Sequence, residues 1–423
     1  MSCFSKTFSR IALFPLAVVL LVGISFGQAT ETVLYSFGGY VGDALGPVGG
    51  LVFDAAGNIY GTTISGGPIS GCPGDSGCGT VFELSPSSNG WIETILYNFC
   101  TNGNQYTCPD GAEPWDGLIF DKSGNLYGTT YMGGTGYGTV FELSPPSIPG
   151  SAWTETVLWT FGGEPDDGAF PYYGKLNWDA SGNLFGMTVS GGTYDHGTVF
   201  ELSPQPGGAW KESILHNFDR SDGAEPMFGV AIDGSGNLYG AAEGGGRADG
   251  CKLGCGVVYE LSPAGEGSWS YSTLFQFTFS GGAYPTTPIS IDNAGNLYGT
   301  LEYGGRSACS EGCGGIFKLA RNTGGEIKKY TLFFNGQNGA NPASGVLLDG
   351  RSGIAFGTTL FGNNVYRTNG QTIQTLYRFC SLPGCADGSS PEGGILQGRS
   401  GELYGVTEQG GSYGGGVVFS ISQ

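Results

Sequence analysis

The stretch that decides the fold is 54–67, DAAGNIYGTTISGG. It recurs as DKSGNLYGTTYMGG from Asp121 and as DASGNLFGMTVSGG from Asp179. Seven copies are present, the last one degenerate, and they begin at Asp54, Asp121, Asp179, Asp233, Asp292, Asp349 and Gln397. Self-similarity at a regular period is the signature of a repeat architecture, so the fold has to be interpreted in units.

Three other short pieces recur around each copy. An apolar run such as Gly50-Leu-Val-Phe-Asp54 precedes it, GTVFELSP from Gly79 follows it, and ETILYNF from Glu93 ends the unit. All are rich in Val, Ile, Thr, Tyr and Phe and bounded by Gly, Pro, Asn or Asp, which are strand signals. The Asp-x-x-Gly-Asn link predicts a tight hairpin. Four antiparallel strands in roughly 60 residues predict a propeller blade.

The two ends of the repeat region indicate how the ring closes. A lone fourth-type strand, 31–37, comes first, and a third-type strand, 416–422, comes last. We therefore predict an all-β, seven-bladed β-propeller in which residues 32–37 pair beside residues 417–421 and leave no open edge. Glycines in the middle of the second strands are expected to leave room for aromatic rings of the adjoining blade; they are Gly61, Gly128, Gly186, Gly240, Gly299, Gly357 and Gly405.

The first 29 residues do not belong to the repeats. Lys6 and Arg10 precede the apolar run 11–24, and small residues follow around Gly27 and Ala29. This pattern predicts a cleavable signal peptide over 1–29, with an uncleaved anchor as the alternative, and one propeller domain over 30–423. We expect a monomer that is secreted, periplasmic or on the cell surface, with no transmembrane segment in the mature chain.

Charge narrows the range of partners. Removal of Lys6 and Arg10 from the 17 basic residues leaves 15 against 36 acidic ones, a net charge of −21. A surface of this sign repels phosphate backbones, so nucleic acid is excluded as a partner. The expected partner is an extracellular ligand, glycan or protein.

Cysteine spacing agrees with export. Apart from Cys3, the cysteines form five close pairs: Cys72 with Cys78, Cys100 with Cys108, Cys251 with Cys255, Cys309 with Cys313, and Cys380 with Cys385. Local pairs in an exported protein predict disulfides. A metal site is the alternative, but the pairs lie on different blades and only His196 and His216 could complete it. Short cystine loops are expected to stiffen loops more than the whole ring.

The cystine pairs and a second repeated phrase are expected at the same end of the ring. The phrase DGAEP starts at Asp110, and its relatives start at Asp167, Asp222, Gly281, Asn338 and Asp387. It immediately precedes each innermost strand, so its acidic side chains could gather around Ca²⁺ at the channel mouth. The alternative is that Asp-Gly forms a turn and Pro directs the chain into the strand. No other cofactor is expected.

The candidate ligand-binding residues lie on this end of the ring. Aromatic rings could stack on a polyol while carboxylates accept its hydrogen bonds, although the same rings could merely cover the tops of the blades. The candidates are Asp110, Trp115, Asp167, Tyr172, Tyr173, Asp222, Tyr284 and Asp387. No G-x-S-x-G, H-E-x-x-H, Walker or EF-hand motif is present, so no catalytic residue is assigned.

The combination GNLYGTT…GG…GTVFELSP resembles the GloVer-type tandem repeat family of exported bacterial proteins, over essentially all of 31–423. The resemblance implies a secreted or surface propeller-like protein without an assigned activity. Some members carry a C-terminal sorting anchor, and we expect none after Ser422-Gln423. The hairpin phrase is also similar to NHL-type propeller repeats, which bind partners more often than they catalyse.

These observations favour a non-catalytic binding scaffold for a glycan, peptide or cell-envelope component. The alternative is a metal-assisted propeller lyase or hydrolase acting on an extracellular polymer. An enzyme is expected to present different polar groups at the axis, whereas the matched positions of the innermost strands carry no ionisable group. These positions are Val52, Ile119, Asn177, Ala231, Ser290, Leu347 and Leu396.

Overall fold

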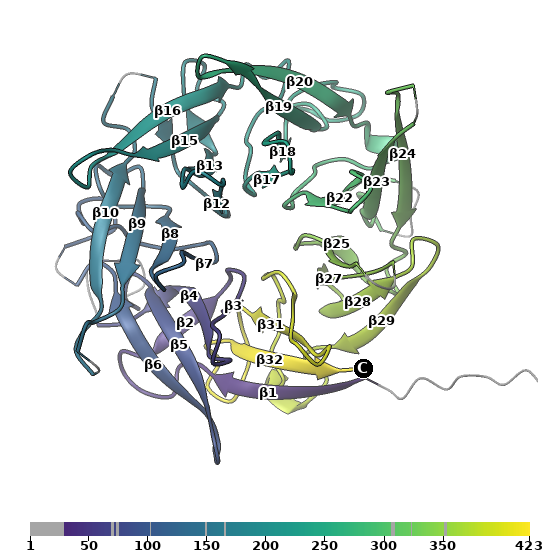
Figure 1. Cartoon of the computed structure of the whole chain (residues 1–423). Helices are drawn as coiled ribbons and strands as arrows, with labels where there is room; N and C mark the ends of the chain where they lie inside the picture. Colours follow the sequence, from purple (N-terminus) through teal and green to yellow (C-terminus); the bar gives the residue numbers. More distant parts are fainter. Residues whose placement is uncertain are drawn as a thin grey trace, which may run out of the picture.

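The computed structural model is a ring of seven antiparallel sheets around a central axis (Figure 1). It describes residues 29–68, 72, 76–101, 103–148, 150–164, 166–305, 309–322, 324–350 and 353–423. The predicted signal peptide lies outside the described residues except for Ala29. Within these ranges no helix is long and apolar enough to cross a membrane. The seven-bladed propeller predicted from the repeats is confirmed.

Each blade begins with a very short strand next to the axis and continues outward through three longer ones. The first blade consists of β3 (Val52–Phe53), β4 (Ile59–Gly66), β5 (Thr80–Ser87) and β6 (Gly90–Asn98). The second consists of β7 (Ile119–Phe120), β8 (Leu126–Thr130), β9 (Thr139–Ser144) and β10 (Thr154–Thr160). The third consists of β12 (Asn177–Trp178), β13 (Leu184–Thr188), β15 (Thr198–Pro204) and β16 (Trp210–Asn217).

The remaining blades repeat this order. The fourth contains β17 (Ala231–Ile232), β18 (Leu238–Ala242), β19 (Val257–Gly265) and β20 (Ser268–Gln276). The fifth contains β21 (Ser290–Ile291), β22 (Leu297–Leu301), β23 (Gly315–Arg321) and β24 (Ile327–Phe333). The sixth contains β26 (Leu347–Asp349), β27 (Ile354–Phe361), β28 (Asn364–Thr368) and β29 (Ile373–Arg378). Short 3₁₀ turns cover Phe279–Gly281 and Pro383–Cys385.

The seventh blade joins the two ends of the chain. It contains β30 (Leu396–Gln397), β31 (Leu403–Thr407), β32 (Val417–Ser422) and, from the other end of the chain, β1 (Thr30–Ser36). Thr32 pairs with Ser420, and the Phe37 amide donates to the Gly416 carbonyl at 3.0 Å. Figure 1 shows β1 lying along β32. The predicted closure is confirmed, and it covers an edge that would otherwise expose unpaired backbone groups.

Neighbouring blades pack through one repeated contact between aromatic rings. The aromatic ring that follows each fourth strand meets a ring on the third strand of the next blade, edge-on in five pairs and tilted in two, with centroids 4.6–5.2 Å apart. The pairs are Phe37–Phe82, Phe99–Phe141, Phe161–Phe200, Phe218–Tyr259, Phe277–Phe317, Phe334–Tyr366 and Phe379–Phe419. All these rings are almost completely buried. Edge-to-face pairs of this kind add to the hydrophobic energy of the core.

The prediction about the mid-strand glycines needs one correction. Gly61 on β4 lies directly opposite Phe82 on β5, and a Cβ at Gly61 would lie 2.7 Å from the Phe82 Cζ. The ring that occupies the space therefore comes from the adjacent strand of the same blade, and the expectation of a ring from the adjoining blade was wrong. Opposed residues of an antiparallel pair share one face, so the ring folds over the glycine.

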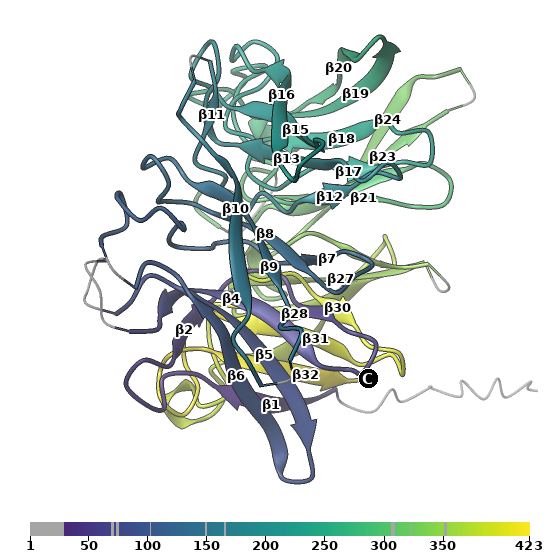
Figure 2. The ribbon, with the colours of Figure 1, turned by 60° about the vertical axis from the view of Figure 1, so that its left-hand side comes forward.

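The ring has two different faces. The Asp-x-x-Gly-Asn turns and the hairpins between third and fourth strands form one end, which we call the turn face. Asp54 holds such a turn because its Oδ1 accepts the amides of Gly57 and Asn58 at 2.7 and 2.9 Å. The hairpin between β5 and β6 projects beyond the rest of the ring in both views (Figures 1 and 2). The other connections form the opposite end, the loop face.

Candidate binding site at the mouth of the channel

The phrase D-G-A-x-P positions the loop face around the axis. In every blade it pairs with the chain at the end of the second strand, either as a bridge or as an accessory strand. The accessory strands are β2 (Ala44–Pro47), β11 (Gly168–Ala169) with β14 (Ser190–Gly191), and β25 (Ala340–Pro342). The bridges are Ala112–Met132, Ala224–Gly244, Ala283–Tyr303 and Ser389–Gln409. The first-blade copy, 43–47 DALGP, was not predicted because Ala-Leu replaces Gly-Ala in it.

The fourth residue of the phrase links one blade to the next. Glu113 has a φ of 56°, and its amide donates to the Cys78 carbonyl of the preceding blade at 2.8 Å. Its own carbonyl accepts the Tyr131 amide at 3.0 Å. Glu225, Tyr284 and the other residues at this position also have positive φ. The phrase is thus architectural, because it joins blades through the backbone and places the residues after the proline at the mouth.

The predicted aspartates each hold their own loop. Asp110 accepts the Tyr97 hydroxyl and the Cys100 amide, both at 3.0 Å. Asp387 is buried and accepts the amides of Ser381 and Leu382. Asp222 accepts the Asp219 amide at 3.0 Å and lies 2.9 Å from His216 Nε2, and Asp167 accepts the Gly163 amide at 3.3 Å.

These aspartates do not meet at one point. Among the described residues the only three His, Cys, Asp or Glu side chains with ligand atoms all within 4.8 Å of one another are Cys72, Cys78 and Cys100. The carboxylates therefore cap separate loops, as the alternative interpretation of the Asp-Gly turns predicts. Calcium at this face stays a prediction, and it would need ligands other than four converging aspartates.

Three of the predicted aromatic residues do come together. Trp115 in the second blade packs on Tyr172 and Tyr173 in the third, with ring centroids 5.0 and 5.5 Å away. Tyr172 and Tyr173 themselves are 4.5 Å apart. Tyr284 contacts Tyr303 instead, at 6.0 Å. In the third blade two tyrosines follow the proline, where the second blade has Trp115 and Asp116.

Tyr173 reaches across the ring. Its hydroxyl donates to Glu392 Oε2 of the seventh blade at 2.9 Å, a contact between residues 219 positions apart. Its ring stacks on Phe228 with a centroid distance of 5.3 Å. The φ of Tyr173 is 48°, which is an uncommon and strained value for a bulky residue. Such strain persists only where surrounding contacts compensate for it, and it is frequent at functional sites.

A cavity of about 260 Å³ opens at this mouth. Its lining comes from the residues after the proline in five blades and from the ends of three second strands. They are Tyr172, Tyr173, Met227, Phe228, Glu243, Thr286, Glu302, Pro342, Ala343, Leu360 and Glu392. The volume is slightly below the roughly 300–1,000 Å³ of drug-sized sites, so it suits one side chain or one sugar ring.

The glutamates of this cavity were not predicted as site residues. Glu243 and Glu302 follow the second strands of blades four and five, and Glu408 occupies the matching position in blade seven. The other copies carry Ile64, Tyr131, Val189 and Leu360 there. A glutamate at three of the seven equivalent positions could have indicated the site from the sequence. These positions follow the second strands, whereas the residues compared in the sequence analysis lie on the innermost strands.

Burial perturbs these carboxyl groups. It is the main reason that the pKa of Glu243 rises to about 7, with the negative charges of Glu302 and Glu225 adding to it. Burial and then the charge of Glu408 raise the pKa of Glu392 to about 7 as well. Burial likewise raises the pKa of Glu302. None of the ion pairs between described residues involves any of these mouth carboxyls.

A second cavity of about 270 Å³ lies on the turn face between blades three and four. Its polar side chains are already engaged. Asp179 accepts the amides of Ser181 and Asn183, and Glu201 Oε1 accepts the Ser203 hydroxyl at 2.9 Å. In the mouth cavity, by contrast, Thr286 is 7% exposed and its hydroxyl has no hydrogen-bond partner. The mouth is therefore the better candidate site.

Disulfides brace the loops around the mouth, and all five pairs predicted from the spacing are confirmed. The bonds join Cys72 to Cys78, Cys100 to Cys108, Cys251 to Cys255, Cys309 to Cys313, and Cys380 to Cys385. The alternative of a metal site shared between pairs is not needed to explain these cysteines, because each sulfur is bonded to its predicted neighbour. Cross-linked loops of this kind lose less entropy when they bind a ligand.

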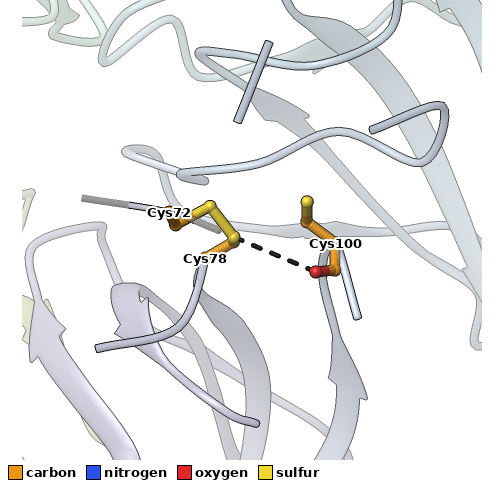
Figure 3. A group of neighbouring side chains, drawn as sticks. All are labelled: Cys72, Cys78 and Cys100. Carbon is orange, nitrogen blue, oxygen red and sulfur yellow. Dashed lines mark hydrogen bonds between the residues drawn. A yellow bond between two sulfur atoms is a disulfide. The ribbon is translucent and has the colours of Figure 1, made fainter. Parts of the chain in front are cut away.

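Two of the disulfides touch each other. The Cys78 sulfur lies 4.0 Å from the Cys100 carbonyl oxygen, although the two cysteines belong to different loops (Figure 3). The sulfurs of these two pairs form a small buried cluster with Ala112, and Cys108 in this cluster is completely buried. The loop face is therefore braced between the first and second blades as well as within each loop.

The sequence comparison agrees with this architecture. The model of the Gloeobacter/Verrucomicrobia repeat matches residues 20–248 and 174–419. The chain belongs to the Gloeobacter/Verrucomicrobia repeat family. This confirms the family resemblance inferred from the repeated phrases, and the blades of the propeller are built from the repeats of that family. No protein of curated function matches the sequence.

Solved structures match this chain at low sequence identity. One is PorZ, a surface component of the type-IX secretion system of Porphyromonas gingivalis, with 14% identity and a TM-score of 0.52. The match covers 88% of the present chain but only 46% of the PorZ chain. A protein of unknown function from Dyadobacter fermentans matches at 12% identity, over 94% and 99% of the two chains, with a TM-score of 0.45.

Proposed function

We propose that this chain is a non-catalytic binding protein whose loop face holds an extracellular ligand at the channel mouth. The observation that carries the proposal is the cavity itself, which residues of five blades line and in which packed aromatic rings and buried carboxyl groups from four of them converge. Rings held by mutual packing offer a rigid apolar surface, and carboxylates fix the orientation of a polar ligand. This combination supports recognition of one side chain or sugar of a larger partner.

The surroundings of the cavity support a macromolecular partner. Of the twelve exposed large hydrophobic side chains among the described residues, nine lie on loop-face connections or at their edge. They are Tyr40, Val41, Tyr106, Tyr137, Tyr194, Leu253, Phe361, Leu382 and Tyr413. Tyrosine is enriched in protein interfaces because it combines a large contact area with a polar tip. An uneven distribution of this kind indicates an interaction surface.

An extracellular location fits the same evidence. Five disulfides are expected to persist only in an oxidising compartment. PorZ, which shares the fold, is described as a bacterial surface component. Secretion or surface exposure of this chain is therefore part of the proposal, and so is removal of the N-terminal segment before residue 30.

The test is a binding survey with variants on each face. The mature chain is screened on glycan and peptide arrays, and every hit is repeated with Tyr173→Ala at the mouth and Trp269→Ala in the turn-face cavity. We expect the mouth variant to lose binding and the turn-face variant to keep it, with thermal unfolding checked for both. Tyr194→Ser and Tyr413→Ser are two further loop-face variants, and they leave the core intact because both side chains are exposed. Binding that survives all loop-face changes and disappears with Trp269→Ala contradicts the proposal.

A further inference from the structure

Resting on the proposed function, we infer that the group bound at the mouth is an organic cation, the ammonium of a lysine or the guanidinium of an arginine on a polypeptide partner. The first reason is an imbalance of charge. Glu243 and Glu302 from adjacent blades and Glu392 from the seventh blade line one cavity. No ion pair between described residues reaches them. A cation would supply the missing counter-charge.

A neutral side chain points to the same ligand independently of the carboxyls. Thr286 lines the cavity, is more than nine-tenths buried, and leaves its hydroxyl without a hydrogen-bond partner. An unsatisfied buried hydroxyl is costly and uncommon in folded proteins. Its oxygen can accept an N–H from a bound ammonium or guanidinium group, which satisfies the hydroxyl when the ligand is present.

The aromatic wall suits a cation as well. Tyr172, Tyr173 and Phe228 line the same cavity, and Tyr173 and Phe228 stack nearly parallel, at 18° between ring planes. The negative faces of such rings attract ammonium and guanidinium groups, most strongly where water is excluded. Carboxylates and aromatic rings in one cavity provide complementary contacts for the charged end and the alkyl stem of Lys or Arg.

The spacing of the carboxyls favours an organic cation over a metal ion. In the part of the chain that the structure describes, no three carboxylate or imidazole ligand atoms lie within 4.8 Å of one another. A calcium ion needs six to eight oxygens at roughly 2.3–2.6 Å, and no three carboxyl groups of the described residues converge to provide them. Several N–H donors on an extended cation can instead reach separate carboxylates.

Binding should depend on pH. The groups that face Glu243 are Glu302, Glu225, Tyr284 and Tyr303. Glu311 and Tyr303 face Glu302, and Glu408, Tyr172 and Tyr173 face Glu392. Because these neighbours are acidic or neutral, Glu243 and Glu392, each with a pKa of about 7, are partly protonated near neutral pH and must ionise to hold a cation. Affinity should therefore rise from pH 6 to pH 8, by roughly tenfold for each carboxyl that loses its proton.

The experiment uses defined probes and calorimetric titration of the mature chain. The probes are pentapeptides Ac-Gly-Gly-Lys-Gly-Gly-NH₂, the corresponding Arg and Nε-acetyl-lysine peptides, free spermidine and Ca²⁺. We expect the Lys or Arg peptide to bind more tightly at pH 8 than at pH 6, and the acetylated peptide to bind at least about tenfold more weakly. Tighter binding of spermidine than of either peptide would overturn the assignment to a polypeptide.

Substitutions locate the site. Glu243→Gln and Glu302→Gln should each weaken binding of the cationic peptide about tenfold, the effect of one charge-assisted hydrogen bond. The matched control is Glu201→Gln in the turn-face cavity, which should leave affinity unchanged. Thr286→Val should weaken binding without lowering stability, because the variant removes a hydroxyl that has no partner in the protein. Weaker binding at unchanged stability would show that Thr286 contacts the ligand and does not merely support the fold.

Other results overturn the inference in distinguishable ways. Equal binding of the Lys and acetyl-lysine peptides, or no heat from any cationic peptide up to about 10 mM, rules out a cation. Ca²⁺ binding that is abolished by Glu302→Gln also rules out the organic cation, because a metal ion would then occupy the mouth. A neutral glycan that binds at the mouth contradicts the cation but leaves the proposed function standing. Loss of all binding at the loop face, with binding on the turn face, contradicts both.

Discussion

Replacing Glu212 by glutamine should stabilise the folded ring at pH 7. Glu212 on β16 lies within hydrogen-bonding reach of Asp167, and each carboxyl has one buried oxygen without a partner. Two adjacent buried carboxylates repel each other, so the pair keeps one proton. The amide of a glutamine can donate to Asp167 as a protonated glutamic acid does, but it has no proton to lose.

The magnitude follows from the pKa of Glu212. Burial, then the charge of Asp167 and the hydrogen bond with it, raise this pKa from 4.5 to about 9. The folded state therefore keeps a proton that the unfolded chain releases above pH 4.5. The stability from this group is fully present below pH 4.5 and is lost as the pH rises towards 9. At pH 7 the loss is about 3 kcal/mol, at about 1.4 kcal/mol per pH unit, and Glu212→Gln should recover up to that amount.

Urea unfolding at pH 5 and pH 7 measures the effect. The two proteins should differ by less than about 1 kcal/mol at pH 5 and by about 2–3 kcal/mol at pH 7. The control is Glu266→Gln at an exposed hairpin position, which should change stability at neither pH. The reasoning is refuted if Glu212→Gln is destabilising at pH 7, or if its effect is the same at both values.

Three other blades contain versions of this pair. Burial and a facing aspartate raise the pKa of Glu31, Glu93 and Glu155 to about 7 each. In the fifth blade Gly281 replaces the aspartate, and there Lys329 donates to the Gly281 carbonyl at 2.7 Å. In this blade both carboxyls of the pair are therefore absent. The whole ring should accordingly lose stability as the pH rises from 4.5 through 7.

Three further predictions concern the ring itself. Phe37→Ala should lower the free energy of unfolding by about 3–5 kcal/mol, measured in urea, because it removes a buried ring whose centroid lies 5.1 Å from that of Phe82 at the closing blade. A loss below about 1 kcal/mol would mean that this closure contributes little to stability. Gly61→Ala should lower the free energy of unfolding by about 1–3 kcal/mol, because the added Cβ clashes with Phe82. Gly50→Ala in the same blade should be nearly neutral, because an added Cβ there has no atom within 4 Å. Equal losses for the two variants would contradict the packing. Alkylation without reductant should label none of the ten paired cysteines, and mass spectrometry that finds labelled pairs would contradict the disulfides.

Much of the fold was predictable because each blade is a local unit. The strands, the turn at Asp54 and cystine loops such as the one that joins Cys251 to Cys255 all involve residues close in sequence, so their patterns are visible without the structure. Ring closure was predictable from a count of strand types. The aromatic side chain that covers Gly61 was not predictable, because strand spacing alone does not say which of two neighbouring aromatic residues covers a glycine.

The candidate site was predicted only in part. Trp115, Tyr172 and Tyr173 were correctly expected to lie on the loop face, whereas the aspartates hold loops separately. The sequence by itself determined the repeat, the number of blades and the disulfide pairing, since these depend on periodicity and short separations. Only the tertiary structure decided that Tyr173 meets Glu392 and that Glu243 and Glu302 share a cavity with them. Contacts across the axis depend on the closed ring, which brings together side chains 219 positions apart.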